Sequence, residues 1–272
     1  MKITFIGGGN MASALIAGLA GQLTDGANIH VVDPNAGQLA RLKDNYGVGG
    51  AQQVDAAVGA SDVIVLAVKP QQMREVAASV LPQLGAKPLV LSIAAGIRGA
   101  DLSRWLGGYG AIVRTMPNTP ALIGQGITGM VAMAGVSPAQ KKAADDIMKA
   151  VGATVWLDDE AMIDPVTAVS GSGPAYVFYF IEAMQQAAEE LGLTAEQGKQ
   201  LALATFTGAA QLAARSPDDV AVLRERVTSK GGTTYAALTS MEQSGVKQAI
   251  VDAVKAASAR GRELGEELGG VA

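Results

Sequence analysis

The sequence predicts an α/β domain with a doubly wound parallel sheet, followed by an all-α domain. Short apolar segments alternate with helical patterns through residues 1–163, as the strands and crossover helices of a parallel sheet do. A glycine-rich turn follows the first apolar segment directly. After about residue 164 the strand patterns stop, and helical patterns continue through 164–272. The sequence therefore predicts two domains, 1–163 and 164–272.

The first predicted strand, residues 3–6, runs directly into a glycine turn and a helix. Its residues are β-branched or aromatic, which suits a buried parallel strand. The next six residues, 7–12, read GGGNMA and fit G-x-G-x-x-A, in which Gly7 allows the tight turn and Gly9 lets the backbone approach a pyrophosphate. Ala12 lets the helix pack closely on the strand. Because a helix N-terminus offers free N–H groups and a positive dipole, the segment predicts the phosphate-binding turn of a Rossmann-type domain.

A second strand is predicted over 29–32, and it ends on Asp33. Dinucleotide-binding sheets place an acidic residue about 20 positions beyond the glycine turn, where it bonds the adenosine ribose. Asp33 stands at about this distance. Strand, turn and acid together predict a nucleotide site, and the alternative is a turn that binds no phosphate.

The other strands of the first domain are expected near Val48 and over 62–68, 88–93, 111–115, 128–134 and 153–157, with helices over 36–45, 54–59 and 138–151. Ligands of open parallel sheets bind at the carboxyl ends of strands, so 67–70 is expected to border the cofactor. The small residues 94–96 at the same edge leave room for a planar ring. A loop over 116–120 contains two prolines and is expected to be rigid; its contact with ligand is left open.

Composition excludes several functions. The 272-residue chain has no cysteine, which excludes disulfides, thiolate catalysis and cysteine metal sites. Its one histidine, His30, lies within a predicted strand, which removes most support for histidine triads and multi-histidine metal sites. With 21 basic against 25 acidic residues, the net charge of −4 offers no basic surface for nucleic acid.

The longest clean apolar run, 63–68, is far below the roughly 20 residues of a membrane span. No charged leader precedes the first strand, so a soluble, cytoplasmic protein is expected.

The second half is predicted to contain helices over 164–191, 195–214, 217–227, 235–244 and 246–268. Thr194 and Ser216 are predicted N-caps, and Gly192 and Gly245 are predicted helix stops. These helices are rich in alanine and poor in large apolar side chains. Such a thin bundle often completes its core against a second subunit, so we expect an intertwined homodimer.

Two segments with Ser and Gly interrupt this helical half. Residues 169–175, VSGSGPA, lie within the first predicted helix, and residues 228–234, TSKGGTT, join two later helices. Their hydroxyl and N–H groups are suited to holding a carboxylate, and a helix kink and a capped turn are the alternative interpretations. Composition leaves both interpretations open.

Six motifs occur in this order along the chain: Ile6-Gly7-Gly8-Gly9-Asn10-Met11, Ala67-Val68-Lys69-Pro70, Ala94-Ala95-Gly96, Met116-Pro117-Asn118-Thr119-Pro120, Ser170-Gly171-Ser172-Gly173-Pro174-Ala175 and Ser229-Lys230-Gly231-Gly232-Thr233-Thr234. Together they closely resemble the pyrroline-5-carboxylate reductases over essentially the whole chain. The first motif is shared by many dinucleotide folds, whereas the last two are specific to this family. The resemblance implies a Rossmann domain, an all-α dimerisation domain, and dimers that often assemble into larger rings. It also implies NAD(P)H-dependent reduction of the cyclic imine 1-pyrroline-5-carboxylate to L-proline, the last step of proline biosynthesis.

The resemblance also implies roles for individual residues. Those implied for the cofactor are Ile6, Gly7, Gly8, Gly9, Asn10 and Met11 around the pyrophosphate, Asp33 and Asn35 at the adenosine ribose, and Ala67, Val68, Lys69, Pro70, Ala94, Ala95 and Gly96 along the path to the nicotinamide. Those implied for the substrate carboxylate are Ser229, Gly231, Gly232, Thr233 and Thr234, with the Thr234 hydroxyl near the ring nitrogen as the catalytic group. Imine reduction needs a hydride donor and a proton on nitrogen, but no nucleophile and no metal, which agrees with the composition.

Two positions depart from the family pattern. Asp33 repels a 2′-phosphate and favours NADH, whereas the family more often uses NADPH and Asn35 can still bond a phosphate. The expected cofactor is therefore NADPH or NADH. Lys230 stands where many members carry proline, which changes the stiffness of the loop and adds a charge near the substrate carboxylate.

Other functions compete with this one. A related imine oxidoreductase is one alternative. A β-hydroxyacid dehydrogenase of similar two-domain plan is another, but that family places a catalytic lysine shortly after a glycine motif on the interdomain helix. Here Gly173 is followed by PAYVFYF, without lysine, which argues against that family. A non-catalytic NAD(H)-binding sensor normally needs a segment that binds a partner or DNA, and this acidic chain shows none. The expected partners are a small-molecule substrate and further copies of the chain, with no nucleic acid and no membrane.

Overall fold

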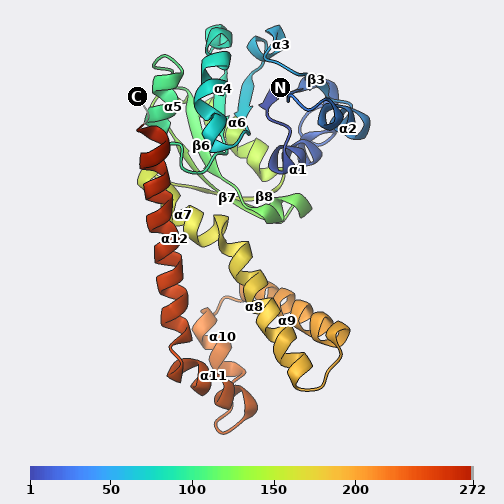
Figure 1. Cartoon of the computed structure of the whole chain (residues 1–272), viewed down its shortest axis with the longest axis vertical. Coiled ribbons are helices and arrows are strands. Elements are labelled where there is room, and N and C mark those ends of the chain that lie inside the picture. The colour runs from blue at the N-terminus through green and yellow to red at the C-terminus, as the bar shows by residue number, and fades with distance from the viewer. Residues whose placement is uncertain (271–272) are drawn as a thin grey trace. The chain divides into compact units, whose positions relative to one another are not determined.

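The computed structural model describes residues 1–270 (Figure 1). These residues form two compact units: one contains 1–172 together with the chain from Ala256 onward, and the other is Gly173–Lys255. The units thus divide later in the chain than the predicted boundary between 163 and 164. The end of the last helix, from Ala256, belongs to the first unit and not to the second. Packing explains the difference, because a Cβ added to Gly129 in the sheet would meet Val166 at 2.6 Å, and one added to Gly96 would meet Leu264 at 3.4 Å.

Within the described residues, an eight-stranded sheet with the order β3-β2-β1-β4-β5-β6-β7-β8 forms the centre of the first unit. The strands are β1 (Ile3–Ile6), β2 (Ile29–Val32), β3 (Gly49–Ala51), β4 (Val63–Leu66), β5 (Leu89–Ser92), β6 (Ile112–Met116), β7 (Gly126–Ala132) and β8 (Gly152–Trp156). The strands from β3 to β6 pair in parallel, which confirms the predicted doubly wound fold. β7 runs antiparallel to β6, and β8 is parallel to β7.

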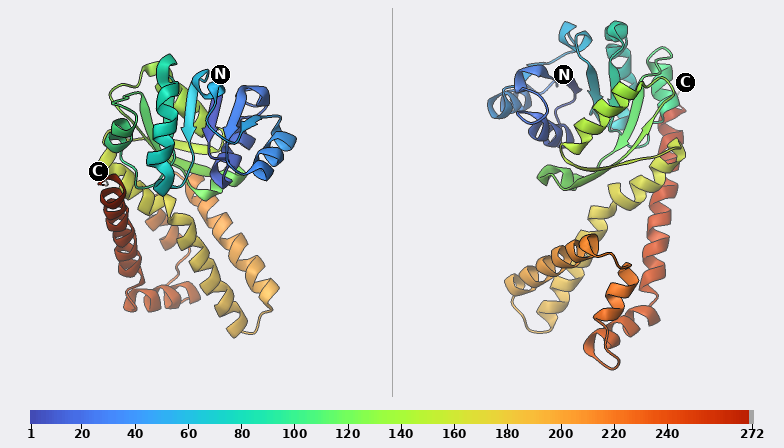
Figure 2. Two further views of the ribbon diagram at one scale, coloured as in Figure 1. Left: turned by 45° about the horizontal axis from the view of Figure 1, so that its top comes forward. Right: turned by 180° about the vertical axis from the view of Figure 1, so that it is seen from behind.

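Helices cover both faces of the sheet. Phe5 packs in one buried cluster with residues of α1 (Asn10–Leu19), α2 (Ala36–Tyr46) and α6 (Pro138–Lys149). Ile64 packs in a second cluster with residues of α3 (Ala56–Gly59), α4 (Met73–Val80) and α5 (Gly99–Trp105). Figure 2 shows α4, in teal, in front of the sheet in the left view and α6, in yellow-green, in front of it in the right view. α4 and α5 are helices beyond those that the sequence predicted.

The predicted helix over 164–191 is divided by a π-helical turn. α7 (Ile163–Val166) leads into the π turn Thr167–Gly171, and α8 (Gly173–Glu190) follows. The Ser172 N–H donates to the Thr167 carbonyl at 2.8 Å, and the Ser170 carbonyl accepts from Asn118 Nδ2 at 3.1 Å. Asn118 Oδ1 also accepts from the Ile127 N–H at 3.0 Å, so one side chain joins the loop after β6 to β7 and to this turn. Such π turns are often found at functional sites.

The second unit is helical. It contains α8, α9 (Ala195–Arg215), α10 (Val220–Arg226), α11 (Thr233–Gln243) and the first part of α12 (Val246–Gly269), and α8 and α9 form a hairpin (Figure 2). Thr194 is confirmed as the N-cap of α9, since its hydroxyl accepts from the Gln197 N–H at 3.2 Å. The predicted N-cap at Ser216 is wrong. Asp219 caps α10 by accepting from the Ala221 N–H at 2.8 Å, whereas the Ser216 hydroxyl accepts from the nearer Asp218 N–H at 3.1 Å.

His30 lies on β2, next to the edge strand β3, with its Nε2 3.2 Å from Asp55 Oδ1. Across residues 1–270, no group of three or more His, Asp or Glu side chains is placed to hold a metal ion. In the same part of the chain, no helix has both the length and the apolar character needed to cross a membrane.

Candidate functional site

A pocket of about 680 Å³ opens at the carboxyl ends of β1, β2 and β4. This is the edge of a parallel sheet at which nucleotides bind, and the volume suits a small-molecule site. Of the residues predicted for the cofactor, the pocket is lined by Ile6, Gly7, Gly9, Asp33, Ala67, Val68 and Lys69. The fold thus brings seven predicted residues from three separate segments to one cavity.

The glycine turn after β1 is built as the motif predicts. Gly7 has a φ of +99°, and a Cβ added there would meet the Ala67 carbonyl oxygen at 2.6 Å, so no other residue fits. No atom lies within 4 Å of a Cβ added to Gly9, which leaves open space above its backbone. Gly9 is the N-cap of α1, and no side chain caps this helix. The first N–H groups of α1, at Asn10 and Met11, therefore remain available for an anion.

Gly8 is held from both sides by the segment that follows β2. Its N–H donates to Asp33 Oδ2 at 2.7 Å, and its carbonyl oxygen accepts from Gln38 Nε2. Asp33 Oδ1 accepts from the Asn35 N–H at 2.8 Å. Asn35 itself lies outside the pocket lining and caps α2, accepting from the Gln38 N–H at 3.1 Å. The spacing from the glycine turn predicts Asp33, whereas no motif predicts Gln38.

The remaining residues predicted for the cofactor lie outside the pocket lining. Asn10 and Met11 begin α1, and Pro70 begins a short 3₁₀ turn after β4. Ala94, Ala95 and Gly96 follow β5, where Gly96 faces Leu264 and Leu268 of α12. The structure thus brings Gly96 against the last helix, and the place of 94–96 along the nicotinamide path stays a prediction.

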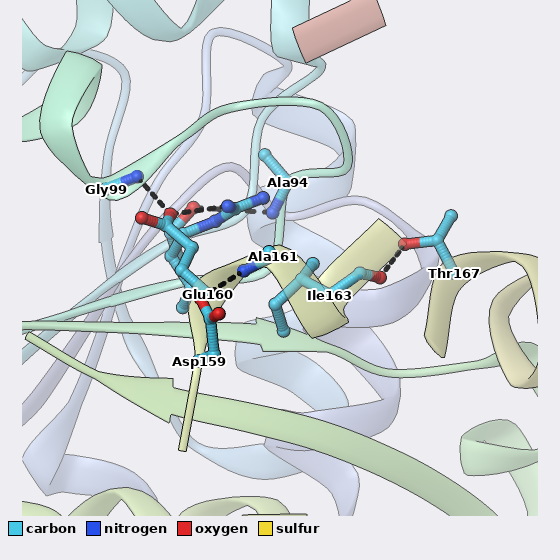
Figure 3. Close-up of polar contacts among 9 residues, drawn as sticks. Ala94, Gly99, Asp159, Glu160, Ala161, Ile163 and Thr167 are labelled. Carbon is cyan, nitrogen blue, oxygen red and sulfur yellow. Dashed lines mark hydrogen bonds and ion pairs between the residues drawn. The ribbon is translucent and has the colours of Figure 1, made fainter. Parts of the chain in front are cut away.

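An ion pair between a buried arginine and a partly exposed glutamate lies beside residues 94–99. The Arg114 side chain on β6 is only 5% exposed, and its Nη1 lies 2.5 Å from Glu160 Oε1. The same Glu160 oxygen accepts from the Gly99 N–H at 2.5 Å, at the start of α5. Asp159 accepts from the Ala161 N–H at 2.9 Å and so orders the turn that carries Glu160 (Figure 3). Arg114 and Glu160 line a second pocket of about 570 Å³ together with Gly96. No sequence motif points to this pair.

The predicted substrate loop lies in the second unit, between α10 and α11. Gly231 has a φ of +75°, and the Gly232 N–H donates to the Ser229 carbonyl at 3.0 Å. Gly232 is the N-cap of α11, and no side chain caps this helix. The N–H groups at Thr233 and Thr234 therefore remain available, and the positive end of an 11-residue helix suits a carboxylate.

Two family models match the chain. The model described as pyrroline-5-carboxylate reductase dimerisation matches residues 160–264. The model described as NADP oxidoreductase coenzyme F420-dependent matches residues 2–96. The first match spans the substrate loop, and the second spans the glycine turn and Asp33.

Relatives match over nearly the full length. Pyrroline-5-carboxylate reductase of Pseudomonas aeruginosa is 48% identical over 268 residues, which cover 98% of each chain. A solved pyrroline-5-carboxylate reductase of Coxiella burnetii has a TM-score of 0.91 and 41% identity, covering 97% of this chain and 98% of its own. A solved pyrroline carboxylate reductase of Plasmodium falciparum with NADP bound has a TM-score of 0.87 and 32% identity, with the same coverage. The chain therefore belongs to the pyrroline-5-carboxylate reductase family.

Proposed function

We propose that this chain reduces 1-pyrroline-5-carboxylate to L-proline with NAD(P)H, the last step of proline biosynthesis. Full-length identity of 48% to a named reductase carries the proposal. The pocket at the ends of β1, β2 and β4 supports a dinucleotide site, and the relative solved with NADP supports a nicotinamide cofactor. The chain is thus an oxidoreductase that acts on a CH–NH group.

The residues of the first unit fit a dinucleotide. Open space above Gly9 and the uncapped start of α1 suit a pyrophosphate, and Asp33 borders the place of the adenosine ribose. When bound, the cofactor supplies the hydride that goes to the imine carbon. Lys69 lines the same pocket, where its charge balances that of the phosphates.

The loop of the second unit positions the substrate in this proposal. Backbone N–H groups at Thr233 and Thr234 bind the substrate carboxylate. The Thr234 hydroxyl oxygen accepts a hydrogen bond from the protonated ring nitrogen and so keeps the proton there. A protonated imine is already electrophilic, so orientation and exclusion of water suffice, and no nucleophilic side chain is needed.

A steady-state assay with 1-pyrroline-5-carboxylate tests the function, following oxidation of NADH and NADPH separately and identifying proline as the product. We expect turnover with at least one cofactor. Turnover with another cyclic imine only would favour a related imine reductase. Saturable NADH binding without turnover of any imine, in folded protein, would favour the sensor.

Replacing Asp33 by serine is expected to shift the ratio of kcat/KM for NADPH to that for NADH about tenfold toward NADPH. The reason is that the carboxylate, which lines the pocket, repels a 2′-phosphate. Both KM values should also rise, because the Gly8 N–H loses its acceptor. Asp33→Asn is the matched control, since it keeps an acceptor and removes only the charge. An unchanged ratio in both variants would show that the acid points away from the ribose.

Self-association through the second unit is expected to give a dimer, or a larger ring of dimers. Its helices expose large apolar side chains: Phe178 is 62% exposed, Tyr179 72% and Leu212 60%. Such a surface is typical of an interface. Light scattering at micromolar concentration should give the mass of a dimer or a multiple of it, and Phe178→Glu should lower that mass. A stable wild-type monomer would contradict the proposal.

A further inference from the structure

Gln38 is the one side chain in the described structure that donates to the carbonyl of the glycine turn from outside α1. It stands at the third position of α2. Its Nε2 donates to the Gly8 carbonyl oxygen and, at 3.1 Å, to Ser13 Oγ. The Ser13 hydroxyl in turn donates to the same Gly8 carbonyl at 3.3 Å. Gln38, Ser13 and Gly8 thus form one small hydrogen-bond network.

The Gln38 side chain is itself well fixed. Its backbone N–H donates to Asn35 Oδ1 at 3.1 Å, which places it in the first turn of α2. Its Cγ would lie 3.2 Å from a Cβ added to Gly8, and Leu42 Cδ1 would lie 3.3 Å from the same point. The side chain is half-buried. Its amide therefore reaches Gly8 from a packed position on α2.

The orientation of the Gly8 peptide matters for an anion. Gly7 and Gly9 line the pocket at the ends of β1, β2 and β4, whereas Gly8 does not. Asp33 holds the Gly8 N–H and Gln38 holds the Gly8 carbonyl, so both polar groups of this residue are bound by the segment 33–38. A carbonyl oxygen turned toward a phosphate repels it, whereas the same oxygen bound to Gln38 does not.

We propose that Gln38 is a positioning residue for the dinucleotide pyrophosphate: it holds the Gly8 carbonyl out of the pocket and so fixes the glycine turn for the phosphates. The inference rests on the proposed function in so far as the ligand is NAD(P)H. It assigns Gln38 to the part that NADH and NADPH share, whereas Asp33, which also holds the Gly8 N–H, acts in addition at the ribose, where the two cofactors differ.

The test measures the Kd of NADH and of NADPH by fluorescence titration, without turnover, and kcat by steady-state assay. Gln38→Met keeps the aliphatic stem and removes both donors. We expect it to raise the Kd of both cofactors by the same factor, about fivefold to tenfold, with kcat within about twofold of the wild type. Gln38→Glu should raise both further, because a carboxylate then faces the Gly8 carbonyl.

Gln140→Met is the matched control. Gln140 Nε2 also donates to a backbone carbonyl of another segment, that of Lys87 at 3.3 Å, and its Oε1 accepts from the Ser137 N–H at 3.0 Å in the capping box of α6. It lies outside the lining of the pocket at the ends of β1, β2 and β4. We expect Gln140→Met to lower the thermal midpoint at least as much as Gln38→Met, because the capping box is lost as well, and to leave both Kd values unchanged. A second variant, Ser13→Ala, should also raise the Kd of both cofactors. In the double variant with Gln38→Met, the loss of binding free energy should be smaller than the sum of the two single losses, because the two residues share one network.

Unchanged Kd values in Gln38→Met, with wild-type binding intact, would overturn the inference alone and leave Gln38 a structural residue. A change for NADPH only would also overturn it, because it would place Gln38 at the 2′-phosphate. Failure of the wild type to bind either dinucleotide would overturn the proposed function and the inference with it.

Discussion

Replacing Thr234 by alanine is expected to lower kcat/KM for the imine substrate about 100-fold and to leave the Kd for NADH nearly unchanged. The hydroxyl is proposed to hold the proton on the ring nitrogen, so its loss acts on the substrate and not on the dinucleotide. Thr234 stands in the first turn of α11, at the end of the segment 229–234 to which the family resemblance assigns the substrate carboxylate. Steady-state kinetics with saturating cofactor, together with fluorescence titration of NADH, measure the two quantities.

Thr239→Ala is the matched control for this variant. Thr239 lies on the same helix, and its hydroxyl donates to the Tyr235 carbonyl at 2.8 Å, within the helix. Its replacement should leave kcat/KM unchanged, and Thr234→Ser should restore most of the activity. A collapse of cofactor affinity in Thr234→Ala would show that the loop is wrongly placed at the substrate, and unchanged kcat/KM would remove the catalytic role of the hydroxyl.

Replacing Glu160 by alanine is expected to lower the free energy of unfolding of the first unit by about 3 kcal/mol. The Arg114 guanidinium, whose side chain is 5% exposed, would remain charged without its carboxylate partner. The Gly99 N–H would lose its acceptor as well. Urea denaturation followed by tryptophan fluorescence measures this unit, because both tryptophans of the chain, Trp105 and Trp156, belong to it.

Glu263→Ala is the control for the loss of an exposed ion pair. Its partner Arg260 is 52% exposed, so the change in free energy should be within about 0.5 kcal/mol. Adding Arg114→Met to Glu160→Ala should recover part of the lost stability, because the unpaired buried charge is then removed. A Glu160→Ala variant as stable as Glu263→Ala would mean that Arg114 finds another partner or water.

Much of the fold could be predicted because strands and helices have local periodic patterns. The direction of β7 could not be predicted, because an apolar strand has the same sequence pattern whether it pairs parallel or antiparallel with its neighbour. α4 does have a helical signal, with Met73, Ala77 and Val80 buried at a spacing of four and three residues, but the segment is short. The sequence predicted Ser216 as an N-cap, whereas Asp219 caps α10; both residue types cap helices, and only the backbone path decides between them.

The candidate site was predictable where a local motif defines it and not where distant residues meet. The glycine turn and the spacing to Asp33 are properties of the sequence. The hydrogen bond from the Gly8 N–H to Asp33, 25 residues away, depends on how β1 and β2 pair. The hydrogen bond from the Gln38 amide to the Gly8 carbonyl depends on the same pairing. Arg114 and Glu160 are 46 residues apart, and only the packed fold brings them together. No local pattern signals such pairs.

The return of α12 to the first unit has a consequence for folding during synthesis. Leu268 packs against the buried cluster that contains Ile97 and Leu102, and Arg104 donates to the Gly269 carbonyl at 2.8 Å. These late residues leave the ribosome only after all of 173–255 has been made. Until then the contacts of Leu268 and Gly269 with α5 and its cluster are missing, so the first unit, although most of it is translated first, cannot complete its packing before the end of α12 has been made.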